Sequence, residues 1–407
     1  MKCRHCQTEL RDIFLDLGTA PASNAYLEPT DLAAPESWYP LRLFVCSACR
    51  LVQTDDYIDR EAMFSGSYAY FSSTSRSWLD HAARYAAMIT ERLNLGPASH
   101  VVEVASNDGY LLRNFVAAGI PCLGVEPTDS TADAAEALGI PQRRAFFGVD
   151  LARQLVGEGR AADLVIGNNV YAHVPDINDF TRGLALILKP QGVITLEFPH
   201  LMRLVEGRQF DTVYHEHFSY LSLYTVRRIF AAAGLRVFDV EELPTHGGSL
   251  RVYGCRADAA HPETAAVGRV LDAELARGMD GAAFYAGFQS AADAVKDGLL
   301  DFLLAQKRAG RSVAGYGAAA KGNTLLNYAG VKRDLLAFVC DAAAAKQGRY
   351  LPGSRIPILP PQALHDNRPD FVLILPWNIA EEVRAQLAPL AAQGTRFVCA
   401  LPELRVT

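Results

Sequence analysis

In the middle of the chain, short apolar runs alternate regularly with amphipathic stretches whose apolar residues recur at helical spacing. Repeated strand and helix units of this kind predict a mostly parallel sheet that is covered on both faces by helices. Ligands of such sheets bind at the carboxyl ends of the strands. The expected strands are residues 101–105, 122–125, 163–167, 193–198, 236–240 and 249–253, the last two forming an antiparallel edge hairpin.

The flanking regions show the same helical and strand patterns. An amphipathic helix is expected over residues 77–95, closed by Gly96 and Pro97. Alanine-rich helical spacing predicts two helices within residues 262–309. A second strand, loop and helix unit begins at residue 311, and a further α/β domain is therefore expected at the C-terminal end.

Composition narrows the class of protein. The chain has 407 residues, of which 50% are hydrophobic and 21% charged, so it can bury the cores of two or three domains. The net charge is -6, no basic tract stands out, and nucleic acid is not an expected partner. Neither a signal segment nor a membrane span is evident. We expect a cytoplasmic protein that acts on small molecules without a membrane partner, and a monomer is compatible with this.

Four cysteines form two C-x-x-C pairs, Cys3 with Cys6 and Cys46 with Cys49. Two such pairs can complete the tetrahedral four-thiolate shell of a structural Zn²⁺ ion, although the spacer exceeds the common ~15–20 residues. A disulfide is disfavoured in a reducing compartment, and a redox motif needs only one pair. We therefore predict a zinc ion that stabilises a small module, since a closed shell has no open position for substrate.

The stretch from Tyr214 to Phe218 (YHEHF) places two histidines beside a glutamate and a tyrosine. Histidine titrates near neutral pH, and a neighbouring carboxylate or phenol can orient it, as in a positioned general base. A His-x-His pair could equally bind a metal ion or be structural. The stretch alone leaves these three interpretations open.

The first expected strand runs into a turn that ends at Gly109, and an acid, Glu126, ends the second strand. Such a turn brings backbone amides near a ligand, and the acid suits hydrogen bonding to ribose hydroxyls. Ala105 and Asn107 stand where the dinucleotide fingerprint has glycine, which disfavours pyrophosphate. A nucleoside without phosphates, such as S-adenosylmethionine, fits better.

Several motifs together resemble the S-adenosylmethionine-dependent C-methyltransferases that act on nucleotide-linked 4-keto-6-deoxyhexoses, among them the dTDP-sugar C-3'-methyltransferases. The resemblance covers essentially the whole chain. It implies an α/β fold: a Rossmann-like class I methyltransferase sheet, a small N-terminal zinc module and a second, C-terminal Rossmann-like domain. The motifs are VVEVASNDG (101–109), GVEP (124–127), NNVYAHVPD (168–176), YHEHF (214–218) and GYGAAAKGN (315–323).

This resemblance implies three regions and a set of site residues. The regions are a zinc module (1–60), a donor-binding methyltransferase domain (61–255), and a helical connector with a substrate-binding domain (256–407). Residues expected around S-adenosylmethionine are Glu103, Asn107, Asp108, Gly109, Glu126 and Asn168. Expected active-site residues are Tyr68, His173, Tyr214, Glu216 and His217. For His173 alone, the residue pattern would favour a packing role.

Substrate-binding residues are expected in two loops. Gly317, Lys321 and Gly322 lie in a small-residue loop that could bind the diphosphate of a nucleotide sugar, or could be a structural remnant of a Rossmann-like domain. His246 lies in a polar loop that either faces the sugar or is a plain hairpin turn.

The resulting hypothesis is methylation of a carbon next to the ketone, with C-3' favoured over C-5'. His217 is the candidate base, Glu216 would orient or tune the site, and Tyr68, Tyr214 and His173 hold the sugar or stabilise charge. The aromatic run 64–73 suits a lid as well as a packed connector. The alternatives are an O- or N-methyltransferase and a non-enzymatic zinc-ribbon binding protein.

Overall fold

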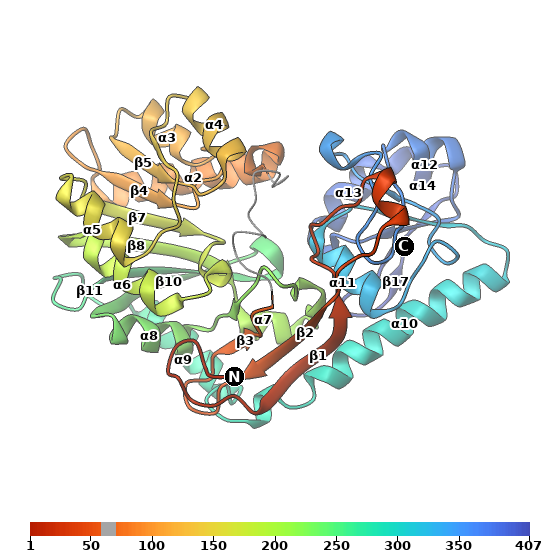
Figure 1. Cartoon of the computed structure of the whole chain (residues 1–407), viewed down its shortest axis with the longest axis horizontal. Helices are drawn as coiled ribbons and strands as arrows, with labels where there is room; N and C mark the ends of the chain where they lie inside the picture. Colours follow the sequence, from red (N-terminus) through yellow and green to blue (C-terminus); the bar gives the residue numbers. More distant parts are fainter. Residues whose placement is uncertain (58–70) are drawn as a thin grey trace.

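The structure is a computed structural model that describes residues 1–57 and 71–407. Tyr68 and most of the aromatic run 64–73 lie outside the described residues, so their roles stay predictions. Within the described parts, the chain forms three sheets of four, seven and six strands. In Figure 1 the seven-stranded sheet and the six-stranded sheet form two lobes, and the N-terminal strands lie below and between them.

The seven-stranded central sheet has the order β10-β11-β8-β7-β4-β5-β6. The strands from β4 to β8 pair in parallel, while β11 runs antiparallel to both β8 and β10. This confirms the mostly parallel sheet and the edge hairpin expected from the sequence. The strands are β4 (Val101–Val104), β5 (Cys122–Val125), β6 (Gln142–Arg143), β7 (Ala162–Asn168), β8 (Leu188–Pro199), β10 (Leu235–Leu243) and β11 (Ser249–Arg256).

Helices surround the central sheet because their apolar residues recur at helical spacing and pack on its two faces. Two buried clusters result, one on each side of the strands. The helices are α2 (Arg76–Leu93), α3 (Leu112–Ala117), α4 (Asp129–Ala137), α5 (Val149–Gly157), α6 (Ile177–Ile187) and α8 (Leu223–Ala232). The short helix α7 (Leu201–Glu206) follows β8 and packs instead into a third buried cluster, which also includes β1.

The four-stranded sheet joins the N-terminal module to the YHEHF stretch. Its strands are β1 (Asp12–Ala20), β2 (Tyr39–Val45), β3 (Val52–Thr54) and β9 (Ser219–Tyr220). The last of these follows YHEHF directly and pairs with β3. The N-terminal module therefore holds YHEHF by backbone hydrogen bonds, a connection that crosses the regions expected at residues 1–60 and 61–255.

The C-terminal part begins with two helices, as predicted for residues 262–309, and continues into the six-stranded sheet. The phenyl ring of Phe288 in the second helix stacks on Phe14 of β1, with centroids 4.8 Å apart. One buried apolar cluster runs from β1 through this helix into the C-terminal sheet, so the N-terminal and C-terminal parts share a core. The elements are α9 (Ala265–Ala276), α10 (Phe288–Arg308), β12 (Val313–Tyr316), α11 (Ala320–Tyr328), β13 (Val339–Cys340), β14 (Ile358–Leu359), α12 (Gln362–Asn367), β15 (Phe371–Ile374), α13 (Ala380–Gln386), α14 (Ala388–Ala391), β16 (Arg396–Cys399) and β17 (Arg405–Val406).

In the part of the chain that the structure describes, each helix is too short or too polar to cross a bilayer.

Candidate active site

A cavity of about 370 Å³ lies at the carboxyl ends of the central strands and extends to the N-terminus of α11 in the C-terminal lobe. This is the position that an open parallel sheet offers to ligands, and the volume lies within the usual range for small-molecule sites. Nine residues expected from the sequence line it together: Asn107, Glu126, Asn168, His173, Tyr214, Glu216, His217, His246 and Lys321.

Five other expected residues do not line this cavity: Glu103, Asp108, Gly109, Gly317 and Gly322. The three glycines lie where a side chain would collide with a neighbour. A Cβ at Gly109 would meet Ile140 and one at Gly317 would meet Pro376. A Cβ at Gly322 would approach Leu375. Close packing therefore accounts for these glycines without any ligand contact.

The structure adds lining residues that the sequence did not single out. Asn24, Trp78 and Lys346 come from three separate segments and line the same cavity. None of them belongs to a recognisable motif, so nothing local marked them. Asn169 also lines the cavity, and its position beside Asn168 in NNVYAHVPD was the one available signal.

The turn that follows β4 and ends at Gly109 has three residues in the left-handed backbone conformation that glycine favours, although two of them are not glycine. The φ angles are 56° at Ala105, 50° at Asn107 and 77° at Gly109. Past this turn, the Glu126 carboxylate accepts hydrogen bonds of 2.9 Å from the backbone amides of Asn107 and Thr128. Burial raises the pKa of Glu126, and these two amides oppose that shift.

The cavity residues fit S-adenosylmethionine. Glu126 is fixed by one amide on each oxygen, so its remaining lone pairs can accept the two hydroxyls of a ribose. The side chain of Asn168 is 8% exposed and its amide has no hydrogen-bond partner among the described residues, which leaves it available to a polar ligand group. Apolar walls at Pro127 and Phe147 suit a planar base.

Replacing Glu126 by glutamine is expected to weaken binding of S-adenosylmethionine about 10- to 100-fold, because hydrogen bonds to an ionised group contribute about 1.5–3 kcal/mol. Calorimetry with the purified chain measures this. The matched control is Glu136→Gln, a change on α4 away from the cavity, which should leave the affinity unchanged. Equal affinity for the Glu126 variant would contradict the ribose assignment.

His217 is held as a neutral imidazole. Its Nδ1 donates a 2.9 Å hydrogen bond to the carbonyl oxygen of Thr212, which leaves Nε2 as the proton acceptor. Burial lowers the pKa of His217 well below its usual value, and His173 contributes in the same direction. The His217 ring lies 4.0 Å from the Tyr214 ring and 4.6 Å from the His173 ring, centroid to centroid.

Glu216 does not orient His217 through a hydrogen bond in the described residues; that role belongs to the Thr212 carbonyl. Instead, the Glu216 carboxyl accepts a 2.7 Å hydrogen bond from Nδ2 of Asn24. Burial raises the pKa of Glu216 to about 7. His215 faces away from this group, with Nε2 3.2 Å from the carbonyl oxygen of Pro40.

The loop around His246 contributes a side chain to the cavity and is more than a hairpin turn. His246 has a left-handed backbone with φ 53°, and its Nε2 lies 3.2 Å from Nδ2 of Asn169. Burial lowers the pKa of His246 to about 4, so its imidazole is neutral.

Lys321 enters the cavity from α11 of the C-terminal lobe. Its Nζ donates a 2.7 Å hydrogen bond to Oδ1 of Asn378 and lies 4.8 Å from the centre of the Trp377 ring. The indole of Trp377 in turn donates a 2.7 Å hydrogen bond to Asp211. Lys321 is thereby positioned where the two lobes meet.

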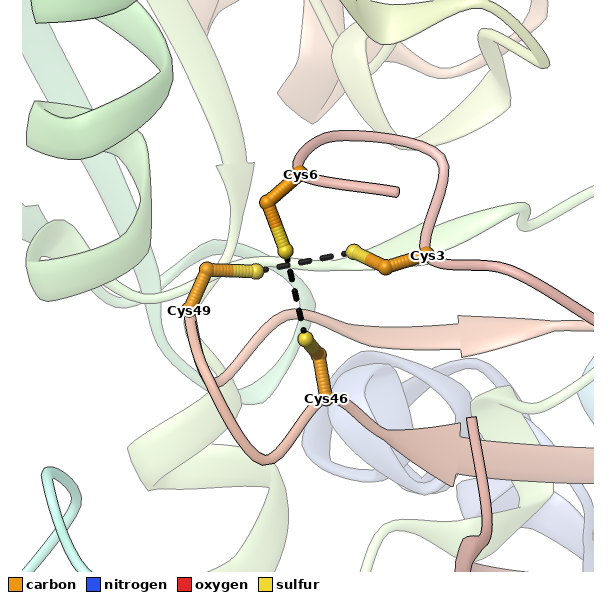
Figure 2. A group of neighbouring side chains, drawn as sticks. All are labelled: Cys3, Cys6, Cys46 and Cys49. Atoms are coloured by element: carbon orange, nitrogen blue, oxygen red, sulfur yellow. Dashed lines mark hydrogen bonds between the residues drawn. The ribbon is translucent and has the colours of Figure 1, made fainter. Parts of the chain in front are cut away.

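The four N-terminal cysteines point their sulfur atoms at one centre (Figure 2). All four Sγ atoms lie within 4.8 Å of one another, with Cys3 and Cys49 3.5 Å apart and Cys6 and Cys46 3.4 Å apart. Tetrahedral Zn–S bonds of ~2.3 Å place sulfurs roughly 3.8 Å apart, so the group fits zinc. Among the described residues no other metal-binding cluster was found, and the two YHEHF histidines do not form one.

The zinc module contacts the cavity wall through Arg4. The Arg4 guanidinium donates hydrogen bonds to the carbonyl oxygens of Pro175, at 2.7 Å, and Thr54, at 2.8 Å. Pro175 lines the cavity. The four-cysteine centre thus braces the active-site region from outside without contributing a ligand to it.

Comparisons with known proteins cover nearly the whole chain. Residues 3–64 match a family described as "Putative zinc binding domain", residues 77–240 match "Methyltransferase domain", and residues 244–402 match "C-methyltransferase C-terminal domain". The chain is 34% identical over 408 aligned residues to C-methyltransferase NovU of Streptomyces niveus, covering 100% of this chain and 96% of that protein.

Two of the solved structures that match this chain each cover less than half of it. An S-adenosylmethionine-dependent methyltransferase from Mesorhizobium loti matches 44% of this chain and 100% of its own, with 17% identity and a TM-score of 0.35. The magnesium protoporphyrin IX methyltransferase of Synechocystis matches 44% of this chain and 83% of its own, with 17% identity and a TM-score of 0.34.

Proposed function

The chain belongs to the C-methyltransferase family, with S-adenosylmethionine as methyl donor, and from this we propose that it methylates a carbon next to the ketone of a nucleotide-linked 4-keto-6-deoxy sugar. Carbon methylation needs removal of a proton from carbon, which O- or N-methylation does not. The supporting observation is the buried, neutral His217, whose Nε2 is free to accept a proton in the cavity that also holds Asn107 and Glu126.

In the proposed reaction, His217 removes the proton from the carbon next to the ketone, and the resulting enolate carbon attacks the methyl group. Tyr214 and His173 line the same cavity and hold the sugar or stabilise charge on its oxygens. Asn107, Glu126 and Asn168 would hold S-adenosylmethionine, which when bound supplies an electrophilic methyl group. The neutral state of His217 is essential, because a protonated imidazole cannot accept the proton.

The C-terminal lobe suits the nucleotide diphosphate. Lys321 and Lys346 line the cavity beside the first residues of α11, where backbone amides and the helix dipole favour an anion. We assign residues 256–407 to substrate binding, residues 61–255 to donor binding and residues 1–60 to the zinc module. We favour methylation at C-3' over C-5' because the sequence motifs resemble those of a family that includes the dTDP-sugar C-3'-methyltransferases.

The experiment that tests this function is a screen of 4-keto-6-deoxy sugar nucleotides with methyl-labelled S-adenosylmethionine. NMR of the product is expected to show the label on a carbon adjacent to the ketone position, C-3' rather than C-5'. The matched control is the corresponding sugar nucleotide with a C-4 hydroxyl, which lacks the acidic C–H bond and should not react. A label on oxygen or nitrogen would overturn the proposal.

A further inference from the structure

Asn24 is a residue of the N-terminal module whose side chain reaches the active-site cavity. It follows β1 in the chain and lines the cavity together with Glu216. Its Nδ2 donates a 2.7 Å hydrogen bond to Oε1 of Glu216, a residue that is 4% exposed. Among the described residues this is the one hydrogen bond that the carboxyl makes. Oε2 is therefore left for a ligand in the cavity.

The segment that carries Asn24 is anchored to the C-terminal lobe on both sides of this residue. Nδ2 of Asn323 donates a 2.6 Å hydrogen bond to the carbonyl oxygen of Ser23. The Tyr26 hydroxyl donates one of 2.5 Å to the carbonyl oxygen of Ala318. Leu27 next exchanges two backbone hydrogen bonds with Tyr350. Because the segment is fixed in the folded state, little entropy is lost when the Asn24 amide binds the carboxyl.

The geometry points to Asn24 as a positioning residue that keeps the proton of a neutral Glu216 on Oε2, from which it donates a hydrogen bond to the enolate oxygen that forms as His217 takes the carbon proton. An amide N–H group can only donate, so Oε1 must act as the acceptor and the carboxyl proton is left on Oε2. A carboxylic acid kept neutral by burial can serve as an oxyanion donor. This inference rests on the proposed function.

The step balances with the groups present. The C–H bond breaks, its proton goes to Nε2 of His217, and its electron pair forms the carbon–carbon double bond of the enolate. The carbonyl π pair moves to the oxygen, where Glu216 stabilises it. When the enolate carbon bonds to the methyl group, the pair of the broken sulfur–carbon bond stays on sulfur, and the ketone re-forms.

The surroundings of Glu216 suit a neutral acid beside a neutral base. Burial raises the pKa of Glu216 to about 7, which favours the protonated acid that donates a hydrogen bond. Burial lowers the pKa of His217, which favours the neutral imidazole that accepts a proton. Burial also lowers the pKa of His173 to about 4, so this imidazole is neutral. The titratable groups that line the cavity or interact with Glu216 are Tyr26, Tyr110, Glu126, His173, Tyr214, His217, His246, Lys321 and Lys346, and His215 is its chain neighbour.

Infrared difference spectroscopy of the full-length protein tests this inference without a substrate. The protonated carboxyl band of Glu216 is identified by its loss in Glu216→Gln and is titrated with pH. In Asn24→Ala the midpoint is expected to rise by about 1–2 pH units, because the hydrogen bond that favours the ionised form is lost. In Asn24→Asp a second carboxylate should raise it further. An unchanged midpoint in both variants would overturn the inference.

Methyl transfer supplies the second readout. Because Glu216 must be protonated, turnover is present below its pKa and lost as pH rises through it, so the wild-type rate should fall above pH ~7. In Asn24→Ala this limb should move up with the infrared midpoint, and kcat should fall about 10- to 100-fold. The KM for S-adenosylmethionine should stay constant. A wild-type kcat and pH profile in that variant would remove Asn24 from the role.

The matched control is Asn327→Ala, which removes another half-buried amide. Asn327 donates a hydrogen bond to the carbonyl oxygen of Pro352, and neither residue lines the cavity. It should leave the infrared midpoint and the pH profile unchanged; a shift as large as that of Asn24→Ala would overturn the inference. A shifted midpoint in Asn24→Ala together with a failed substrate screen would remove the proposed substrate and keep the Asn24–Glu216 pair. Carbon methylation by the wild-type protein, together with an unshifted midpoint in Asn24→Ala, would keep the proposed substrate and remove the Asn24–Glu216 pair.

Discussion

Replacing His217 by asparagine is expected to reduce methyl transfer about 10²- to 10⁴-fold, the usual contribution of a positioned base. The asparagine amide can still hydrogen-bond to the Thr212 carbonyl that His217 contacts, so the local fold should survive. What is lost is the Nε2 lone pair. Solvent deuterium incorporation into the 4-keto sugar nucleotide, measured without S-adenosylmethionine, isolates the proton transfer from the methylation.

The matched control for this substitution lies two residues away. His215 is also a buried histidine of YHEHF, but it contacts the carbonyl oxygen of Pro40 and does not line the cavity. His215→Asn should therefore keep both deuterium exchange and methyl transfer. If His217→Asn exchanged deuterium at the wild-type rate, His217 could not be the base, and another cavity residue would have to take the proton.

Loss of the zinc ion is expected to have the largest effect on stability. Structural zinc contributes apparent binding energies of about 10–16 kcal/mol, which exceeds the whole free energy of unfolding of many domains. Cys49→Ala removes a buried thiolate of the four-cysteine group and should leave a protein without stoichiometric zinc and with an unfolded N-terminal module. Elemental analysis and thermal unfolding measure the two effects.

Unfolding of the N-terminal module should disturb the active site through two connections. The N-terminal sheet includes β9, which directly follows YHEHF, and the module also carries Asn24. Methyl transfer should therefore fall along with zinc content. Cys399→Ala is the control, because Cys399 lies in β16 and belongs to no metal-binding cluster among the described residues. Wild-type protein purified without zinc, yet stable and active, would contradict the four-thiolate site.

Local sequence patterns were sufficient for much of the fold. Six of the seven strands of the central sheet were predicted to within about five residues, because each contains a short apolar run between turns, the pattern that a buried strand requires. The two-residue strand β6 was not predicted, since it is too short and polar to form such a run. The two C-x-x-C pairs indicated the metal centre because ligand chemistry depends on residue type and short spacing. The same holds for Glu126, which the strand and turn pattern placed at the end of β5.

What the sequence left open are contacts between residues far apart in the chain. Thr212, whose backbone carbonyl orients His217, offers no side-chain signal for that role, since every residue has a carbonyl group. Glu216 was expected to orient or tune the site, and its adjacency to His217 suggested a direct contact with that histidine, whereas the structure pairs the Glu216 carboxyl with Asn24. Residues adjacent in the chain need not contact one another through their side chains.

By itself, then, the sequence of this protein determined most of the elements of the central sheet, the four cysteines of the metal centre and the stretch that carries the candidate acid and base. Only the tertiary structure decided that the N-terminal module supplies an amide to the carboxyl, that β9 completes the N-terminal sheet and that Lys346 faces the cavity. The physical reason is that periodicity and spacing record local backbone geometry, while these contacts depend on how three separately formed sheets pack against one another.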